Sequence, residues 1–156
     1  MQSIISNPQS KVILLVEDNP DDVDFILRAL KKHNVLNEVV VASDGVEALD
    51  YLFGKGKYAA SGVRILPEII LLDLMLPKMN GLEVLQRLRA DNRTKLLPVV
   101  IFTSSNEEQD IFNSYTLGAN SYVQKPVDFT QFSEAIGQIG FYWLFLNKTP
   151  KKGGSA

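Results

Sequence analysis

Apolar blocks alternate with amphipathic blocks along the chain, and this alternation predicts five strands and five helices. Short apolar runs rich in Val, Ile and Leu indicate strands that are buried on both faces, because a strand with one wet face would alternate polar and apolar positions. The predicted strands are Val12–Val16, 39–41, Ile69–Leu72, 99–102 and Ser121–Gln124.

The blocks between the strands have the spacing of amphipathic helices. After Asn19-Pro20-Asp21-Asp22, a turn with helix-starting residues, Val23, Ile26, Leu27 and Leu30 fall on one apolar stripe. The other predicted helices are Gly45–Phe53, 80–90, 107–117 and one that Asp128 caps, with Phe129, Phe132, Ile136 and Ile139 as its stripe.

Strands that alternate with helices in this way predict one α/β domain. Right-handed crossovers then give a parallel sheet with helices on both faces, which is a three-layer sandwich. The length of 156 residues suits a single domain. We expect an N-terminal extension at 1–10, the domain at 11–147 with a loop at 54–64, and a disordered tail at 148–156.

Composition and charge narrow the class of protein. The net charge is −2 and the isoelectric point is about 5.4, which gives no electrostatic reason to expect nucleic-acid binding. The lack of cysteine excludes disulfides, thiolate metal sites and cysteine nucleophiles. No signal peptide is visible, and the longest apolar run, near 141–146, is too short to span a bilayer. The sequence therefore predicts a cytoplasmic protein without a membrane segment.

Polar residues that can do chemistry follow four of the five predicted strands. Glu17 and Asp18 follow the first strand, Asp73 the third, Thr103 the fourth and Lys125 the fifth. In an open α/β sheet, ligands bind outside the carboxyl ends of the strands. We therefore expect three carboxylates, one hydroxyl group and one amine to meet at a single edge of the sheet.

Three carboxylates at close range repel one another unless a positive charge lies between them. A hard dication relieves this repulsion, and Mg²⁺ prefers oxygen ligands while keeping several waters. Two carboxylates, a backbone carbonyl and waters would complete its octahedron. No cluster of His or Cys offers a site for a softer metal.

A magnesium ion with open positions has room for phosphate oxygens, and the side chains fit phosphoryl transfer. Asp73 can attack a phosphoryl donor through its carboxylate, Lys125 supplies a positive charge and Thr103 supplies a hydroxyl donor. The Lys125-Pro126 bond has only a weak trans preference, so a cis peptide that aims the amine inward is possible here.

These residues resemble the receiver domain of bacterial two-component response regulators. Glu17-Asp18, Asp73, Thr103 and Lys125-Pro126 occur in the same order, and residues 71–81 (LLDLMLPKMNG) match the phosphoacceptor segment of that family. The likeness covers nearly the whole chain with five separated motifs, which is far more specific than one short motif. It implies a flavodoxin-like (βα)5 fold with strand order 2-1-3-4-5.

The resemblance also implies a magnesium shell and a donor. Asp18 and Asp73 would bind Mg²⁺ directly, Glu17 directly or through water, and Met75 through its backbone carbonyl. A sensor histidine kinase or a histidine phosphotransfer protein would phosphorylate Asp73. Such a chain is a phosphoacceptor signalling protein and not an enzyme that turns over external substrates.

A switch pair is implied in the same way. Thr103 matches the hydroxyl of the family's switch, and Tyr122 matches its aromatic residue, which moves when Thr103 shifts toward the phosphoryl group. The simpler interpretation of Tyr122 is packing in a strand with a wet hydroxyl group. His33, the only histidine, is expected to be a surface residue at a helix end.

The loop at 54–64 and the aromatic segment at 141–147 resemble the single-domain regulators that serve bacterial phytochromes. Six consecutive apolar residues at 141–146 exceed one helix stripe, and no basic face accompanies them as a membrane anchor requires. We therefore predict a homodimer or partner surface made by Phe141, Tyr142, Trp143 and Phe145.

Two other function classes compete with the switch. Phosphatases and phosphotransferases of the aspartyl-phosphate kind need a second acid two residues after the nucleophile, where this chain has Met75. A flavin- or nucleotide-binding module needs a Gly-rich phosphate loop, but the acidic Asn19-Pro20-Asp21-Asp22 follows the first strand. No output domain is expected after the last helix, so the switch would act through a partner protein or by onward phosphotransfer.

Overall fold

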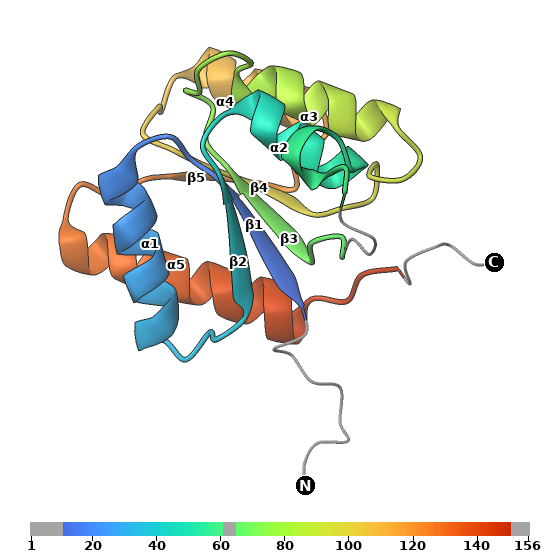
Figure 1. Ribbon diagram of the computed structural model, residues 1–156. Helices are drawn as coiled ribbons and strands as arrows, with labels where there is room; N and C mark the ends of the chain where they lie inside the picture. Colours follow the sequence, from blue (N-terminus) through green and yellow to red (C-terminus); the bar gives the residue numbers. More distant parts are fainter. Residues whose placement is uncertain (1–10, 61–64, 151–156) are drawn as a thin grey trace, which may run out of the picture.

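A parallel sheet with the strand order β2-β1-β3-β4-β5 forms the centre of the molecule, as the resemblance implies (Figure 1). The computed structural model describes residues 11–60 and 65–150, so the expected extension at 1–10 lies outside the described residues. The strands are β1 (Val12–Val16), β2 (Glu38–Ala42), β3 (Ile69–Leu72), β4 (Val99–Thr103) and β5 (Ser121–Gln124).

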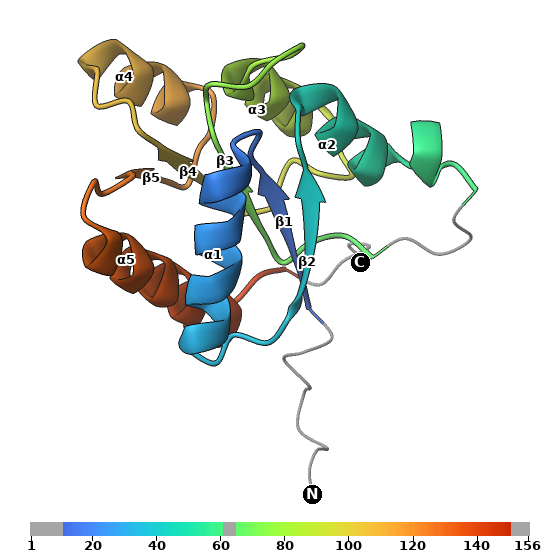
Figure 2. The ribbon, with the colours of Figure 1, turned by 60° about the vertical axis from the view of Figure 1, so that its left-hand side comes forward.

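Helices cover both faces of the sheet and complete the predicted three-layer sandwich. Figure 2 shows α1 and α5 on one face, and α2, α3 and α4 on the other. Within the described residues the helices are α1 (Pro20–Lys32), α2 (Gly45–Phe53), η2 (Gly56–Tyr58), α3 (Gly81–Ala90), α4 (Glu108–Thr116), α5 (Phe129–Phe141) and the π-helical segment η3 (Tyr142–Leu146). Each of these helices is too short or too polar to cross a membrane.

Side-chain caps fix where four of the helices begin. The carboxamide of Asn19 accepts hydrogen bonds from two backbone N–H groups of the first turn of α1. Asp44, Asn80 and Asp128 each accept one backbone N–H bond at the start of α2, α3 and α5. Such a cap satisfies backbone donors that have no partner within the helix and contributes about 1 kcal/mol. The cap of α1 also orients the first turn of the helix toward the edge of the sheet where β1 ends.

The three central strands, β1, β3 and β4, are buried on both faces, as their continuous apolar composition predicts, whereas the edge strands β2 and β5 are only partly buried. Leu14 and Ile70 point into the core under α2 and α3, while their neighbours Ile13 and Ile69 point into the core under α1 and α5. Successive side chains of a strand face opposite sides, so each strand contributes to both cores. Complete burial of one such side chain contributes roughly 1.5–3 kcal/mol.

The register of the sheet aligns the ends of its strands. Val16, the last residue of β1, pairs with Ala42 of β2 and with Leu72 of β3, and Thr103 of β4 pairs with Gln124 of β5. The residues that follow β1, β3 and β5 therefore emerge at one edge. This alignment places the predicted polar residues on a common rim.

The end of the described chain makes specific contacts with the rest of the molecule. Within residues 148–150, which belong to the segment predicted to be a disordered tail, the hydroxyl group of Thr149 donates a 2.9 Å hydrogen bond to the Glu68 carboxylate. In the predicted partner surface, Trp143 is only partly exposed because it packs against the core under α1 and α5. Residues 151–156 lie outside the described residues.

His33 is also more than a surface residue at a helix end. It terminates α1, and its ring lies flush on α5, where a Cβ atom at Gly137 would be 2.5 Å from Cγ of His33. Nε2 of His33 lies 3.5 Å from the hydroxyl oxygen of Ser133, also on α5. The small residue on α5 thus lets the two helices approach at this point.

We expect Gly137→Ala to lower the free energy of unfolding by about 1–3 kcal/mol, because the added methyl group overlaps the His33 ring. The same change in a His33→Ala background should cost clearly less, since the obstructing ring is gone. Urea denaturation of the two single variants and the double variant measures both effects. An equal cost in the two backgrounds would contradict the packing described here.

Candidate functional site

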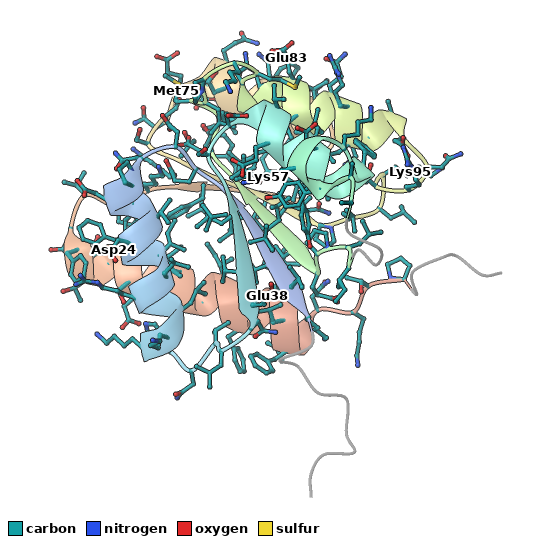
Figure 3. The ribbon with its side chains drawn as sticks, in the orientation of Figure 1. Asp24, Glu38, Lys57, Met75, Glu83 and Lys95 are labelled. Atoms are coloured by element: carbon teal, nitrogen blue, oxygen red, sulfur yellow. The ribbon has the colours of Figure 1, made fainter. Side chains whose placement is uncertain are left out.

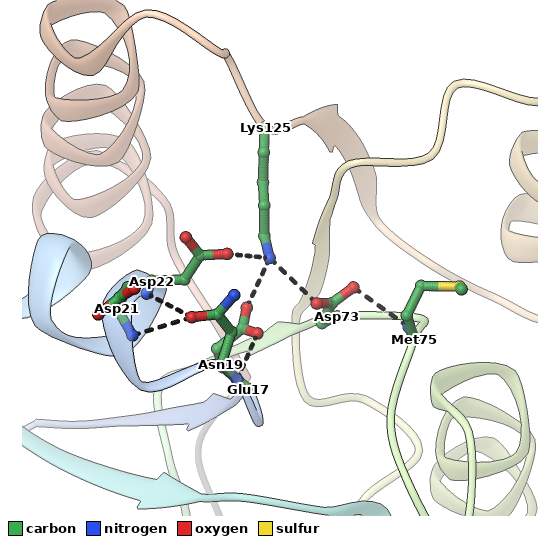
Figure 4. Close-up of polar contacts among 7 residues, drawn as sticks. All are labelled: Glu17, Asn19, Asp21, Asp22, Asp73, Met75 and Lys125. Carbon is green, nitrogen blue, oxygen red and sulfur yellow. Dashed lines mark hydrogen bonds and ion pairs between the residues drawn. The ribbon is translucent and has the colours of Figure 1, made fainter.

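Lys125 lies at the centre of the polar residues that meet at the carboxyl edge of the sheet. Its ammonium nitrogen is 2.7 Å from Oε1 of Glu17, 2.8 Å from Oδ2 of Asp22 and 3.0 Å from Oδ2 of Asp73 (Figure 4). Its side chain is only 9% exposed. The contacts tie β5 to the ends of β1 and β3 and to the start of α1.

The acidic neighbours hold Lys125 in its charged form. Burial by itself would lower the pKa of the amine, but hydrogen bonds to Asp22 and Glu17 outweigh it, and the pKa lies above its usual value. A buried ammonium group costs several kcal/mol unless it is paired and hydrogen-bonded. Three carboxylate contacts satisfy all three of its N–H donors.

Asp22 is a member of the site that the sequence analysis did not single out. The sequence pattern predicts it only as a helix-starting residue in an acidic turn. Its location in the first turn of α1, four residues after Asp18, is the signal that could have found it, because that turn lies beside the carboxyl end of β1. Asn19 determines this placement, since its side chain caps the turn through the N–H of Asp22 at 3.2 Å.

Glu17 is buried and its carboxylate has two partners. Oε1 accepts from Lys125 and Oε2 accepts the backbone N–H of Asn19 at 3.1 Å. Burial is the largest influence and raises the pKa of Glu17 to about 7, against the opposing effect of Lys125. The negative charge of Asp73 raises it further. The site therefore holds more negative charge than Lys125 alone neutralises.

Asp73 is buried at the end of β3, with its two oxygens in different surroundings. Oδ2 contacts Lys125, and Oδ1 accepts the backbone N–H of Met75 at 3.2 Å. The side chain of Met75 is 66% exposed and stands at the rim of the molecule (Figure 3). The backbone after Asp73 is closely packed, since a Cβ atom at Gly81 would lie 2.4 Å from the Asp73 carbonyl oxygen.

The arrangement of carboxylates fits a divalent cation. One oxygen each of Glu17, Asp18 and Asp73 lies within 4.8 Å of the others, as the sequence predicted, and Asp18 is exposed where the other two are buried. Asp22, through its contact with Lys125, adds a fourth carboxylate to this edge of the sheet. An all-oxygen donor set that is open to solvent on one side suits a hard cation that keeps part of its water shell.

Thr103 and Tyr122 occupy the β4 and β5 side of the site. The side chain of Thr103 is fully buried, and its hydroxyl oxygen has no hydrogen-bond partner among residues 11–60 and 65–150. The hydroxyl group of Tyr122 donates a 2.9 Å bond to the carbonyl oxygen of Ser105. Burial raises the pKa of Tyr122 above its usual value. Tyr122 thus has a defined partner and not only the wet hydroxyl group of the simpler interpretation.

The peptide bond between Lys125 and Pro126 is trans, since no peptide bond in the described part of the chain is cis. The sequence left a cis bond possible as a way to aim the amine inward. The backbone N–H of Lys125 instead donates to the carbonyl of Thr103 at 2.7 Å, which continues the pairing of β5 with β4. From that position the extended side chain reaches the carboxylates without a cis bond.

The pKa of Glu17 predicts how the metal-free protein responds to pH. The folded-state value of about 7 lies above the ordinary 4.5, so the folded state binds this proton more tightly than the unfolded state. The contribution is fully present below pH 4.5 and is lost as pH rises through 7. Urea unfolding in a chelator should lose about 1–3 kcal/mol more between pH 5 and pH 8 in the parent than in Glu17→Gln. Equal losses in the two proteins would contradict this assignment.

Comparisons with known proteins agree with this fold and identify the family of the chain. The family profile of the response regulator receiver domain matches residues 13–137. Response regulator Rcp1 of Synechocystis sp. is 37% identical over 139 residues, which cover 89% of this chain and 92% of Rcp1.

Two solved structures superpose on most of the chain. The phosphorylated cyanobacterial phytochrome response regulator RcpA is 42% identical with a TM-score of 0.84, covering 91% of this chain and 99% of that one. The Mn²⁺-bound form of Rcp1 is 36% identical with a TM-score of 0.82, covering 90% and 99%. The chain belongs to the family of response regulator receiver domains of two-component signalling, and it is similar to phytochrome response regulators over most of its length.

Proposed function

We propose that the chain is a phosphorylation switch in which Asp73 accepts a phosphoryl group, with Mg²⁺, from a histidine of a sensor kinase or a phosphotransfer protein. The observation that carries the proposal is the buried ammonium group of Lys125, 3.0 Å from Asp73, together with the buried and unpartnered hydroxyl group of Thr103. Both are donors at an edge where an incoming phosphoryl group needs donors. A cytoplasmic location is part of this proposal.

In the transfer, a carboxylate oxygen of Asp73 forms a bond to phosphorus while the bond from phosphorus to the donor histidine nitrogen breaks. Lys125 holds the Asp73 carboxylate in place beforehand and then contacts a phosphoryl oxygen. Glu17, Asp18, Asp73 and the Met75 carbonyl would hold Mg²⁺, which neutralises charge on the phosphoryl oxygens when it is bound. The related Rcp1 has been crystallised with Mn²⁺.

The switch would follow from the hydrogen bond that Thr103 lacks. Movement of its hydroxyl group toward a phosphoryl oxygen on Asp73 leaves space on the side of Tyr122. Tyr122 would then exchange its bond to Ser105, now 2.9 Å, for a position closer to the site. The surface made by α4, β5 and α5 changes as a result, and a partner that binds this surface reads the phosphorylated state.

Apolar side chains beside the site offer a docking surface for the kinase. Val127, two residues after Lys125, is fully exposed, and Phe129 is largely exposed while packing edge-to-face on Phe25 of α1 with a centroid distance of 5.1 Å. An exposed apolar patch next to a reactive group suits transient association with a helical partner. The likeness to phytochrome response regulators favours a phytochrome-type kinase as donor.

Turnover of external substrates is the weaker alternative. The position two residues after Asp73 holds Met75, which is exposed and offers neither an acid nor a base. A hydrolase needs such a group to activate water or to protonate a leaving group. A signalling role requires only that the phosphoryl group be accepted and held.

We propose in addition that the chain forms a homodimer through the end of α5 and η3. Phe141, Tyr142, Phe145 and Leu146 are each about half exposed, while Leu144 between them is buried. Phe141 and Phe145 lie against each other with a centroid distance of 5.7 Å. A contiguous apolar surface of this kind marks association more often than a solvated face.

The phosphorylation proposal predicts the mass of the protein after reaction with acetyl phosphate. With Mg²⁺, the parent should gain one phosphoryl group, and Asp73→Asn should gain none because the attacking carboxylate is missing. Lys125→Gln should react at least about 10²-fold more slowly, since a buried donor to the phosphoryl oxygens is lost. Intact-mass spectrometry follows each reaction.

Asp24→Asn is the matched control, because Asp24 is an exposed aspartate on α1 whose ion pair among the described residues is with Arg28. It should react like the parent. Omission of Mg²⁺ in the presence of a chelator should stop the reaction. An adduct that persists in Asp73→Asn would place the acceptor elsewhere, and a parent that gains no mass would overturn the proposal.

The dimer proposal predicts the mass in solution by light scattering. The parent should be a dimer at micromolar concentrations, and Phe145→Ser should shift it to a monomer by placing a polar group in the contact. Phe112→Ser on α4 removes an even more exposed aromatic side chain from another surface and should leave the dimer intact. A monomeric parent, or dissociation by Phe112→Ser alone, would contradict this proposal.

A further inference from the structure

A second concave region lies between α2 and α3, away from the carboxylate site. It is a cavity of about 350 Å³. Its apolar wall is made by Val46, Leu49 and Phe53 of α2 and by Met79, which precedes α3. Pockets of roughly 300–1,000 Å³ with apolar walls and a few polar groups are typical of small-molecule sites.

The charged groups around this cavity are not balanced. Arg93 is neutralised by Asp91, with 2.9 Å between Nη2 and Oδ2, and its guanidinium group lies 4.6 Å from the centre of the Phe53 ring. Arg87 and Lys55 also line the cavity, and within the described part of the chain the side chain of neither makes an ion pair or a hydrogen bond. The backbone N–H of Lys55 donates to the carbonyl of Asp50.

Asp50 is the one carboxylate on the wall that has no ion-pair partner among the described residues, so the unpaired cations outnumber the unpaired anions. This surplus of positive charge occurs in a protein whose net charge is −2. The surplus favours an anion at this position, and the apolar wall favours a ligand that also carries a hydrophobic group.

We propose that the cavity binds a small amphipathic anion, such as an aromatic or aliphatic carboxylate. Its apolar part lies against Val46, Leu49 and Met79, and its carboxylate pairs with the guanidinium group of Arg87. An arginine fork suits a carboxylate because it offers two parallel N–H donors.

The distribution of exposed apolar residues distinguishes a small ligand from a docked protein. Of the residues that line the cavity, Val46 alone is a large hydrophobic side chain with more than a third of its surface exposed. The apolar surface is thus recessed between charged side chains and does not form a flat face. Protein-binding surfaces present a broad apolar centre, which among the described residues occurs at η3 and not here.

The test is an NMR titration of the unphosphorylated protein without metal, so its outcome does not depend on the proposed phosphorylation. The chain has three methionines, and two of them are matched reporters: Met79 lines the cavity and Met75 stands beside Asp73. With ¹³C-methyl methionine, 2-naphthoate should shift the Met79 methyl signal in a saturable way and leave that of Met75 in place. The signals are assigned with Met79→Leu.

Two matched comparisons isolate the charge. Arg87→Gln should raise the dissociation constant roughly tenfold, and the uncharged 2-naphthamide should bind roughly tenfold more weakly than 2-naphthoate. Arg28→Gln makes the same substitution on α1, on the opposite face of the sheet, and should change nothing. Arg87 is exposed, and its side chain makes no hydrogen bond or ion pair among the described residues, so its variant should fold normally.

Several results would overturn the proposal. They are an unmoved Met79 signal, equal affinities of Arg87→Gln and Arg28→Gln, and equal affinities for the acid and the amide. A Met79 shift produced by an acidic, phenylalanine-containing peptide but not by 2-naphthoate would assign the cavity to a protein segment. A shift produced by raising the protein concentration alone would assign it to a second copy of the chain.

Discussion

The buried ammonium group of Lys125 is the contact on which the arrangement of the site depends. It joins β5, where it originates, to Glu17 after β1, to Asp22 in the first turn of α1 and to Asp73 after β3. Without it, carboxylates from three separate elements would face one another in a poorly hydrated space and repel. With it, the edge can be assembled before any cation or phosphoryl group arrives.

The site keeps a surplus of negative charge, because it holds one ammonium group and several carboxylates. One ammonium group cannot balance the carboxylates of Glu17, Asp18, Asp22 and Asp73, and the pKa of Glu17 is raised to about 7 as a consequence of its burial among them. Replacement of such a cluster by apolar residues often stabilises a protein. The repulsion between the remaining negative charges thus destabilises the folded protein, and a bound cation would relieve it. This fits a site formed for function more than for stability.

Most of the fold and much of the site could be predicted from the sequence. In a chain where strands alternate with helices, a continuous apolar strand such as Val12–Val16 indicates a buried strand of a parallel sheet. The residue that follows each strand is then expected at the carboxyl edge of that sheet. Glu17, Asp18 and Asp73 lie together as predicted because the sheet register alone brings them there. The strand order followed from the family resemblance and not from the pattern itself.

The features that the sequence did not reveal depend on tertiary contacts. Asp22 joins the site only because the capped first turn of α1 points it at Lys125. His33 packs on α5 because Gly137 lies opposite it, a pairing of residues about a hundred positions apart. Trp143 lies in the π-helical segment η3 and is partly buried because it packs against the core under α1 and α5. No local pattern encodes these relations.

The hydroxyl group of Thr103 is buried without a hydrogen-bond partner among the described residues. This lowers the stability of the folded protein and bears on the proposed switch. A buried polar group without a partner costs about 1–3 kcal/mol. A phosphoryl oxygen on Asp73 would supply the missing acceptor, so phosphorylation would stabilise the state in which Thr103 has moved. A difference of this size shifts a two-state equilibrium by roughly five- to 150-fold. The free energy needed to move Tyr122 would thus come from a hydrogen bond that the unphosphorylated protein leaves unmade.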